Sequence, residues 1–223
     1  MDFFGPLFAN LPVFLPVLLR GAGATLVLTA LSGVVSVAGG LGLAVVRTSR
    51  LPFVSQIATG YIEVIRAIPV LASLFVIYFG LEEFGINLPS LVAAVTGLGM
   101  IGSAYMAENL RGGFAAIPKG QREAAASVGL SPTQVMSHVL LPQAIRVAIP
   151  PSINYAISLL KDTAIASTVA APELLFAAKG LVSQFILPLQ VYFLTGLIYL
   201  AMSLPLAMLG RYLERRLAAG VLQ

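Results

Sequence analysis

Long apolar segments separated by short charged ones dominate this sequence. Three runs without a charged residue are 26, 24 and 31 residues long and lie between Arg20 and Arg47, Glu83 and Glu108, and Lys179 and Arg211. About 20 predominantly apolar residues are enough for a helix to cross a bilayer. The pattern therefore predicts an all-α, polytopic membrane protein that forms a single transmembrane domain. We expect about five spans, at about 21–46, 55–80, 88–110, 143–170 and 189–211.

Two stretches differ from these apolar segments. Residues 1–20 contain Pro6, Pro12 and Pro16 and little periodicity, so we expect an irregular or interfacial lead-in, or a short helix that lies along the membrane. Residues 111–142, between the third and fourth spans, are polar. We expect this second stretch to form a loop in water.

The polar loop carries the signals of a helix–turn–helix. An alanine-rich helix should contain three consecutive residues, Glu123, Ala124 and Ala125. It should end at Gly129, because glycine readily adopts the left-handed conformation that caps a helix C-terminus. Ser131 and Pro132 suit the N-cap and the first position of a second helix. The loop closes at Pro142, so the predicted product is a stiff projection between two spans.

Composition narrows the class of protein further. Hydrophobic residues make up 58% of the chain and charged residues 10%, whereas soluble domains carry about 25% charged residues. The chain has no Cys, which excludes disulfides and thiolate metal sites, and its single histidine, His138, does not make a metal-binding cluster. We therefore expect no metal site on this chain.

The net charge of +4 comes from basic residues in short connecting segments. They form no patch interleaved with aromatic residues, which argues against a nucleic-acid partner. Because basic residues collect in cytoplasmic loops, we place the N-terminus outside and the C-terminus in the cytoplasm. Nine of the thirteen basic residues are then cytoplasmic: Arg47, Arg50, Arg111, Lys119, Arg122, Arg146, Arg211, Arg215 and Arg216.

Small residues recur at helical spacing in two of the predicted spans. The two sets are Ser32, Ser36, Gly40 and Ala44 in the first span, and Gly97, Gly99 and Gly102 in the third. Small side chains let helix backbones approach closely in a membrane. The second set also matches G-x-G-x-x-G, but no strand precedes it, so helix packing is the better interpretation.

The polar loop resembles the cytoplasmic EAA loop of the permease subunits of ATP-binding-cassette (ABC) importers. That pattern is Glu-Ala-Ala, three residues, Gly, nine residues, then Ile-x-Leu-Pro, and this chain departs from it only at Val139, which replaces Ile. The segment YIEVIRAIPVL at residues 61–71 is similar to the Y-x-E-x-x-R-x-x-P-x-L pattern of polar amino acid permeases, the histidine, glutamine and arginine type. The resemblance covers about residues 18–215.

The resemblance implies a type I ABC importer permease fold in the bacterial cytoplasmic (inner) membrane. It implies two ATPase subunits that hold ATP and Mg, a second permease chain that is either a copy or a relative of this one, and an extracytoplasmic solute-binding protein. No Walker sequence occurs in this chain, so we expect no cofactor and no catalysis on it. In such a machine the EAA loop couples the permease to the ATPase through Glu123, Ala124, Ala125, Gly129 and Pro142.

Charged residues inside spans are costly and mark either a pathway or a buried pair. Two interpretations remain open for Glu63 with Arg66 and for Lys161 with Asp162. Each pair neutralises itself and fixes helix packing, or the charges line a cavity where a zwitterionic amino acid meets both signs. The candidates for a substrate pathway are Glu63, Arg66, Tyr105, Glu108, Asn154, Lys161 and Asp162.

Two rival functions remain for such a chain. An ion-coupled secondary transporter or a channel for small polar solutes would use the intramembrane acids for a coupling proton and would need no ATPase. A membrane-embedded enzyme would need a convergent catalytic set, for which the sequence offers no Cys and one His in a loop. The sequence favours the ABC importer.

Overall fold

The computed structural model describes residues 3–49 and 51–218, and this part of the chain contains helices and connecting turns but no strand. Arg50, one of the residues assigned to the cytoplasm, lies outside the described residues. The elements, in chain order, are α1 (Phe4–Arg47), α2 (Pro52–Ala67), α3 (Val70–Glu83), α4 (Ser90–Ala115), α5 (Lys119–Ser127), α6 (Pro132–Gln134), the π-helix η1 (Val135–Leu140), α7 (Leu141–Asp162), the 3₁₀ helix η2 (Thr163–Val169), α8 (Leu174–Phe185) and α9 (Pro188–Ala218).

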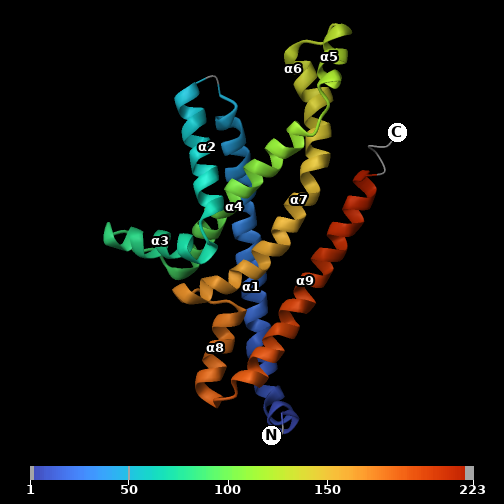
Figure 1. The fold of residues 1–223 in the computed structure, drawn as a ribbon. Helices are drawn as coiled ribbons and strands as arrows, with labels where there is room; N and C mark the ends of the chain where they lie inside the picture. Colours follow the sequence, from blue (N-terminus) through green and yellow to red (C-terminus); the bar gives the residue numbers. More distant parts are fainter. Residues whose placement is uncertain (1–2, 50, 219–223) are drawn as a thin grey trace.

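The helices form an elongated bundle. Figure 1 shows α1, α4, α7 and α9 along its length, with α5 and α6 at one end and α8 near the other. Among the described residues, three helices are long and apolar enough to cross a membrane, namely α1, α4 and α9, and the number rises to as many as five if each of two bent helix pairs counts as one span. By length and composition, this agrees with the five spans predicted. We call the end formed by α5, α6 and η1 the EAA end.

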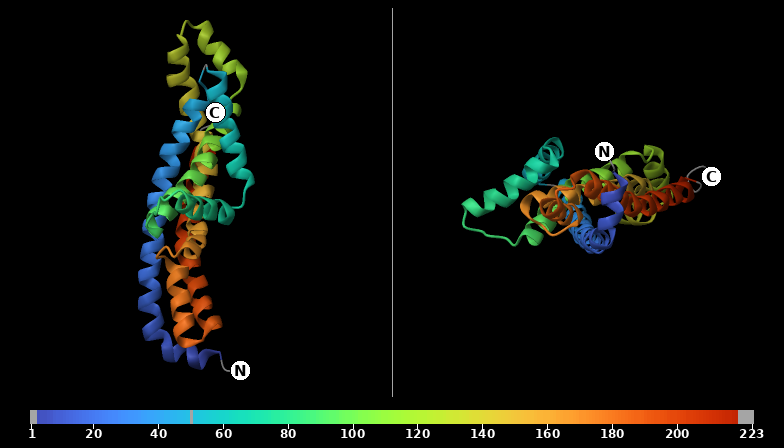
Figure 2. Two further views of the ribbon diagram at one scale, coloured as in Figure 1. Left: turned by 90° about the vertical axis from the view of Figure 1, so that its left-hand side faces the viewer. Right: turned by 90° about the horizontal axis from the view of Figure 1, so that it is seen from below.

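The first twenty residues differ from the expected irregular lead-in. Helix α1 runs without interruption from Phe4 and includes Pro12 and Pro16. Figure 2 shows that its first turns lie at a steep angle to the rest, as expected where proline removes backbone hydrogen bonds. Phe14 and Leu18 are fully buried against α8 and α9. This packing keeps the proline-containing segment helical.

The close helix packing predicted from small residues is confirmed between α1 and α4. Ser32, Ser36 and Gly40 are all buried on α1. A Cβ atom added to Gly40 would overlap Met106 of α4, and one added to Gly102 would overlap Ser36. The two backbones therefore approach as closely as small residues permit.

The second predicted span is bent far more sharply than a proline kink. Helices α2 and α3 lie at 114° to each other, and Figure 1 shows α3 lying crosswise to the long axis of the bundle and extending to one side of it. Ile68 and Pro69 have ψ angles of 137° and 138°, which are extended rather than helical. Proline disfavours the helical conformation in the residue before it, so the helix stops at Ala67 and a new one begins.

A buried glutamate organises the end of the bundle opposite to α5. Glu173 is 1% exposed and forms the N-cap of α8, where its carboxylate accepts hydrogen bonds from the backbone N–H groups of Leu175 and Phe176 at 2.8 and 2.5 Å. The hydroxyl of Tyr199, on α9, donates to the same carboxylate at 2.6 Å. Thr25 of α1 accepts from the backbone of α8. Glu173 therefore ties α8 to α9, and Thr25 ties α1 to the same end of α8.

Candidate functional site

The helix–turn–helix predicted for the polar loop is present at the EAA end. Gly129 has a φ of +86° and closes α5 with two hydrogen bonds, from its own N–H to the carbonyl of Ala126 at 3.0 Å and from Leu130 to Ala125 at 3.3 Å. This is the Schellman arrangement, which requires a left-handed residue at that position. The direction of the chain between α5 and α6 therefore depends on Gly129.

The second helix of the loop begins with a full capping box. The Ser131 hydroxyl accepts from the backbone N–H of Gln134, and the Gln134 side chain accepts from the backbone N–H of Ser131 at 2.9 Å. Pro132 occupies the first helical position. Both reciprocal bonds satisfy donors that a helix start leaves unpaired. The Ser131-Pro132 prediction is thus confirmed in detail.

Small and apolar residues are exposed on this loop beside polar ones. Glu123 and Ala124 are exposed, whereas Ala125 is buried where α5 packs on η1. Val128, just before the turn, is 77% exposed. Pro142 is the second residue of α7 and also has an exposed side chain. A protruding apolar tip on a stiff base is suited to docking in a cleft of another protein.

The loop passes into α7 through an irregularity that the sequence did not predict. Residues Val135–Leu140 form a π-helix, in which the backbone hydrogen bonds span five residues instead of four. Single turns of this kind are rare and occur mostly at functional positions. Here the turn joins the projecting loop to the helix that carries Asn154, Lys161 and Asp162.

Glu108 is the centre of a charge cluster between α1, α2 and α4. Its carboxylate lies 2.9 Å from Arg47, 3.6 Å from Arg66 and 2.6 Å from Arg111. The Glu108 and Arg47 side chains are 20% and 22% exposed. A single acid therefore joins three helices, and the cluster retains a net positive charge.

The Glu63–Arg66 pair expected from their spacing is not formed. Arg66 instead reaches Glu108, and its guanidinium lies over the Tyr105 ring, 5.6 Å from the centroid. Tyr105 in turn stacks on Tyr155 of α7, with ring centroids 5.0 Å apart. Spacing of three residues allows a pair but does not impose it, and the two simultaneous contacts of Arg66 to α4 are the stronger alternative. Glu63 remains exposed on α2.

The remaining candidates lie on α7. Asn154 and Lys161 are exposed and seven residues apart, about two turns, so they share one face. Asp162 is half-buried and is the last residue of α7 before η2. Within the described residues, no ion pair joins Lys161 to Asp162, since adjacent residues on a helix point in different directions.

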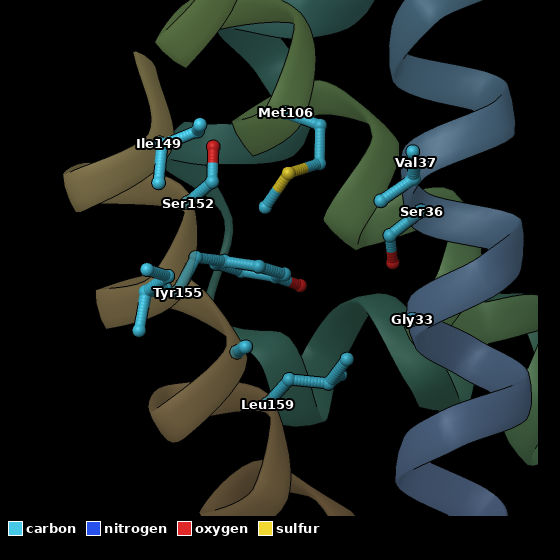
Figure 3. A pocket seen from close by; sticks show the side chains of 10 residues that line it. Gly33, Ser36, Val37, Met106, Ile149, Ser152, Tyr155 and Leu159 are labelled. Carbon is cyan, nitrogen blue, oxygen red and sulfur yellow. The ribbon is translucent and has the colours of Figure 1, made fainter. Parts of the chain in front are cut away.

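A small cavity lies between α1, α4 and α7. Its volume is about 210 Å³, and it is lined by Ser36 of α1, Met106 of α4, and Ser152 and Tyr155 of α7, among others. Figure 3 shows the Tyr155 ring extending from α7 into this space toward α1. The Tyr105–Tyr155 stack therefore links the cavity to Arg66 and the charge cluster.

Three residues of the charge cluster and the adjoining cavity were not predicted from the sequence to have a role there. Arg47 and Arg111 were interpreted only as markers of topology, and Tyr155 was not considered. A polar aromatic residue inside an apolar span was the available signal for Tyr155. Nothing local in the sequence indicates that Arg47 and Glu108, 61 residues apart, are partners.

Comparisons with known proteins agree with this architecture. Residues 36–219 match the family described as "Binding-protein-dependent transport system inner membrane component". The chain is 38% identical over 193 residues to the probable glutamine ABC transporter permease protein GlnM of Bacillus subtilis (strain 168), covering 85% of this chain and 89% of that protein. It is 37% identical over 221 residues to the probable glutamine permease GlnP of the same organism, covering 97% and 99%.

A solved structure extends the likeness to three dimensions. The crystal structure of an amino acid ABC transporter with histidines contains a chain that matches with a TM-score of 0.90 and 35% identity, covering 97% of this chain and 99% of that one. The family match covers most of the sequence, and the helices described above supply the apolar spans that such a component needs. The chain therefore belongs to the family of inner-membrane components of binding-protein-dependent transport systems, and it is a multi-pass membrane permease of the ABC importer type.

Proposed function

We propose that this chain forms the translocation pathway of an ABC importer for polar amino acids. The observation that carries the proposal is the full-length match to a chain of an amino acid ABC transporter, at a TM-score of 0.90. The curated relatives named for glutamine transport point to the same substrate class. Zwitterions with a polar side chain suit a pathway that contains charges of both signs.

Partner proteins supply the energy and the substrate in this proposal. Two ATPase subunits that hold ATP and Mg dock on the exposed tips of the EAA ends, with the N-terminus of this chain outside and its C-terminus in the cytoplasm. A second permease chain, identical or related, completes the pathway, and an external binding protein delivers the amino acid. The exposed Val128 and Ala124 support the docking role, because they leave apolar surface without cover in the single chain.

The intramembrane charges divide into two groups in this proposal. The Glu108 cluster, which includes Arg66, is held by ion pairs and positions α1, α2 and α4. Asp162 and Lys161, which form no ion pair with each other, are the better candidates to meet a substrate ammonium and a substrate carboxylate. Glu63 is exposed on α2 and stays a candidate for the ammonium.

Uptake measured in vesicles tests the proposed function. The complex is reconstituted with its ATPase subunits and binding protein, ion gradients are collapsed with ionophores, and entry of labelled glutamine or arginine is followed. We expect uptake only with ATP. Uptake that needs an ion gradient and no ATPase would instead identify an ion-coupled transporter, and failure to transport any amino acid with ATP present would overturn the proposal.

We expect Gly129→Val to uncouple the ATPase from the permease. A β-branched residue is strained at a φ of +86°, and a left-handed residue with a side chain costs about 1–2 kcal/mol, equivalent to about a 5- to 30-fold effect. Stimulation of ATP hydrolysis by the loaded binding protein should fall by that factor, while the amount of complex in the membrane should not change. Gly129→Asn is the matched control, because asparagine tolerates the left-handed conformation. Equal loss in both variants would contradict the role of the turn.

A further inference from the structure

A second, larger cavity lies at the EAA end, where the loop meets the bundle. Its volume is about 630 Å³, and its walls come from the end of α1, the end of α4, the start of α5, η1 and the first residue of α7. The walls are mostly aliphatic and aromatic, with Leu41 and Val45 on α1 and Leu110 and Phe114 on α4. This cavity is distinct from the one around Tyr155 and shares no lining residue with it.

Four basic residues also line this cavity, and no acidic residue does so among those described. They are Arg47, Arg111, Lys119 and Arg122. Lys119 and Arg122 are three residues apart on α5 and therefore share a face of that helix. Both are exposed, and neither forms an ion pair in the described part of the chain. An apolar pocket is thus bordered by positive charge.

The charge balance around the cavity remains positive. Arg47 and Arg111 both bind Glu108, which also binds Arg66, so one negative charge faces three guanidinium groups. A guanidinium has five N–H donors, and the bonds to Glu108 leave several of them unused on Arg47 and Arg111. These donors add to those of Lys119 and Arg122. The arrangement is suited to a phosphate oxygen.

The position of the cavity selects the kind of anion. It lies where α1 and α4 end and the polar loop begins. In the membrane arrangement of the proposed function, on which this inference rests, a span would leave the hydrocarbon layer for the headgroup region at this level. A free phosphate ion would make no favourable contact with the aliphatic walls. A phospholipid has an acyl chain that can pack against these walls and a phosphate that can bind the basic residues. Clusters of Lys and Arg at this depth attract anionic lipids.

We propose that this cavity binds an anionic phospholipid. The headgroup phosphate lies between Lys119 and Arg122, with Arg47 and Arg111 behind it, and one acyl chain lies against Leu110 and Phe114. Through Lys119 and Arg122 the lipid contacts α5, the helix that carries Glu123. The lipid would thus join the loop to the ends of α1 and α4.

The absence of tryptophan from this chain provides a direct test. Phe114→Trp places one reporter in the cavity wall, and the same complex without that substitution gives the background from the partner subunits. The complex is reconstituted in phosphatidylcholine vesicles that contain an equal mole fraction of either brominated phosphatidylglycerol or brominated phosphatidylcholine. Bromine quenches tryptophan at contact, so the ratio of the two quenching signals reports the preference for the anionic lipid.

We expect phosphatidylglycerol to quench several-fold more strongly than phosphatidylcholine. Lys119→Gln with Arg122→Gln should bring the ratio close to one. Arg215→Gln with Arg216→Gln removes the same charge from the end of α9, outside the cavity, and should leave the ratio unchanged.

Three results would overturn the proposal. Equal quenching by both lipids in the parent would show that the site has no anion preference. Absence of quenching by either lipid would show that a partner subunit fills the cavity. Displacement of phosphatidylglycerol by inorganic phosphate alone would show a site for a free anion.

Discussion

Gly40→Ala is expected to destabilise the protein strongly, although it adds a single methyl group. The added Cβ would overlap the Met106 Cβ and lie 3.1 Å from the backbone oxygen of Ser103. Both atoms belong to the α4 backbone or are bonded to it, so neither can rotate away. Overpacking of this kind costs about 1–3 kcal/mol. Thermal unfolding of the purified complex should show a Tm lower by about 2–12 °C.

Gly42→Ala is the matched control for this substitution. Gly42 lies on the same helix two residues further on, is exposed, and has no atom within 4 Å of its added Cβ. Its Tm should stay within about 2 °C of the parent, because surface substitutions change stability by about 0.5 kcal/mol or less. If both variants unfolded at the same temperature, the close approach of α1 and α4 would not determine stability.

Glu108→Gln is expected to have the second large effect. The amide has the shape of the carboxylate but removes the one negative charge that faces Arg47, Arg66 and Arg111. Breaking a buried ion pair costs about 3–5 kcal/mol, and exposed pairs are worth about 0–1 kcal/mol. The side chains of this cluster are neither fully buried nor fully exposed. We therefore expect the variant to lose about 2–3 kcal/mol of stability, which corresponds to a Tm lower by about 4–12 °C.

A double-mutant cycle separates the charge cluster from a general loss of packing. If Arg47 acts through Glu108, the loss in Glu108→Gln with Arg47→Gln should be clearly smaller than the sum of the two single losses. Glu82→Gln removes an exposed acid at the end of α3 and should leave the Tm unchanged. Additive losses in the cycle would mean that the ion pair does not couple α1 to α4.

The parts of the fold that sequence reasoning predicted are those with local causes. Gly129, Ser131 and Pro132 specify a helix end and a helix start within a few residues, so the turn between α5 and α6 followed from them. The small residues on α1 and α4 predicted a close contact because side-chain volume limits the distance between helices. Three of the five expected spans followed from the length of the uncharged runs.

The features that were missed depend on partners far away in the chain. The second span was predicted as one segment, whereas α2 and α3 lie at 114° to each other and α3 packs against α4. Pairing of Arg66 with its neighbour Glu63 was one of the two interpretations left open, whereas Glu108 of another helix binds Arg66. Periodicity identifies which residues share a helix face, but it does not identify the residue that faces them across a helix interface.

The length of α1 links the subunit to the thickness of its bilayer. Its 44 residues would extend about 66 Å, twice the hydrocarbon layer of about 30 Å. Even the uncharged stretch between Arg20 and Arg47 measures about 39 Å, which is longer than the hydrocarbon layer is thick. Tilting of α1 accommodates such an excess, and the packing of α1 against α4 sets the tilt angle. Because α1 and α4 are in close contact at Gly40, a thinner or thicker membrane that changed the tilt of α1 would also change the tilt of α4, the helix that carries Glu108.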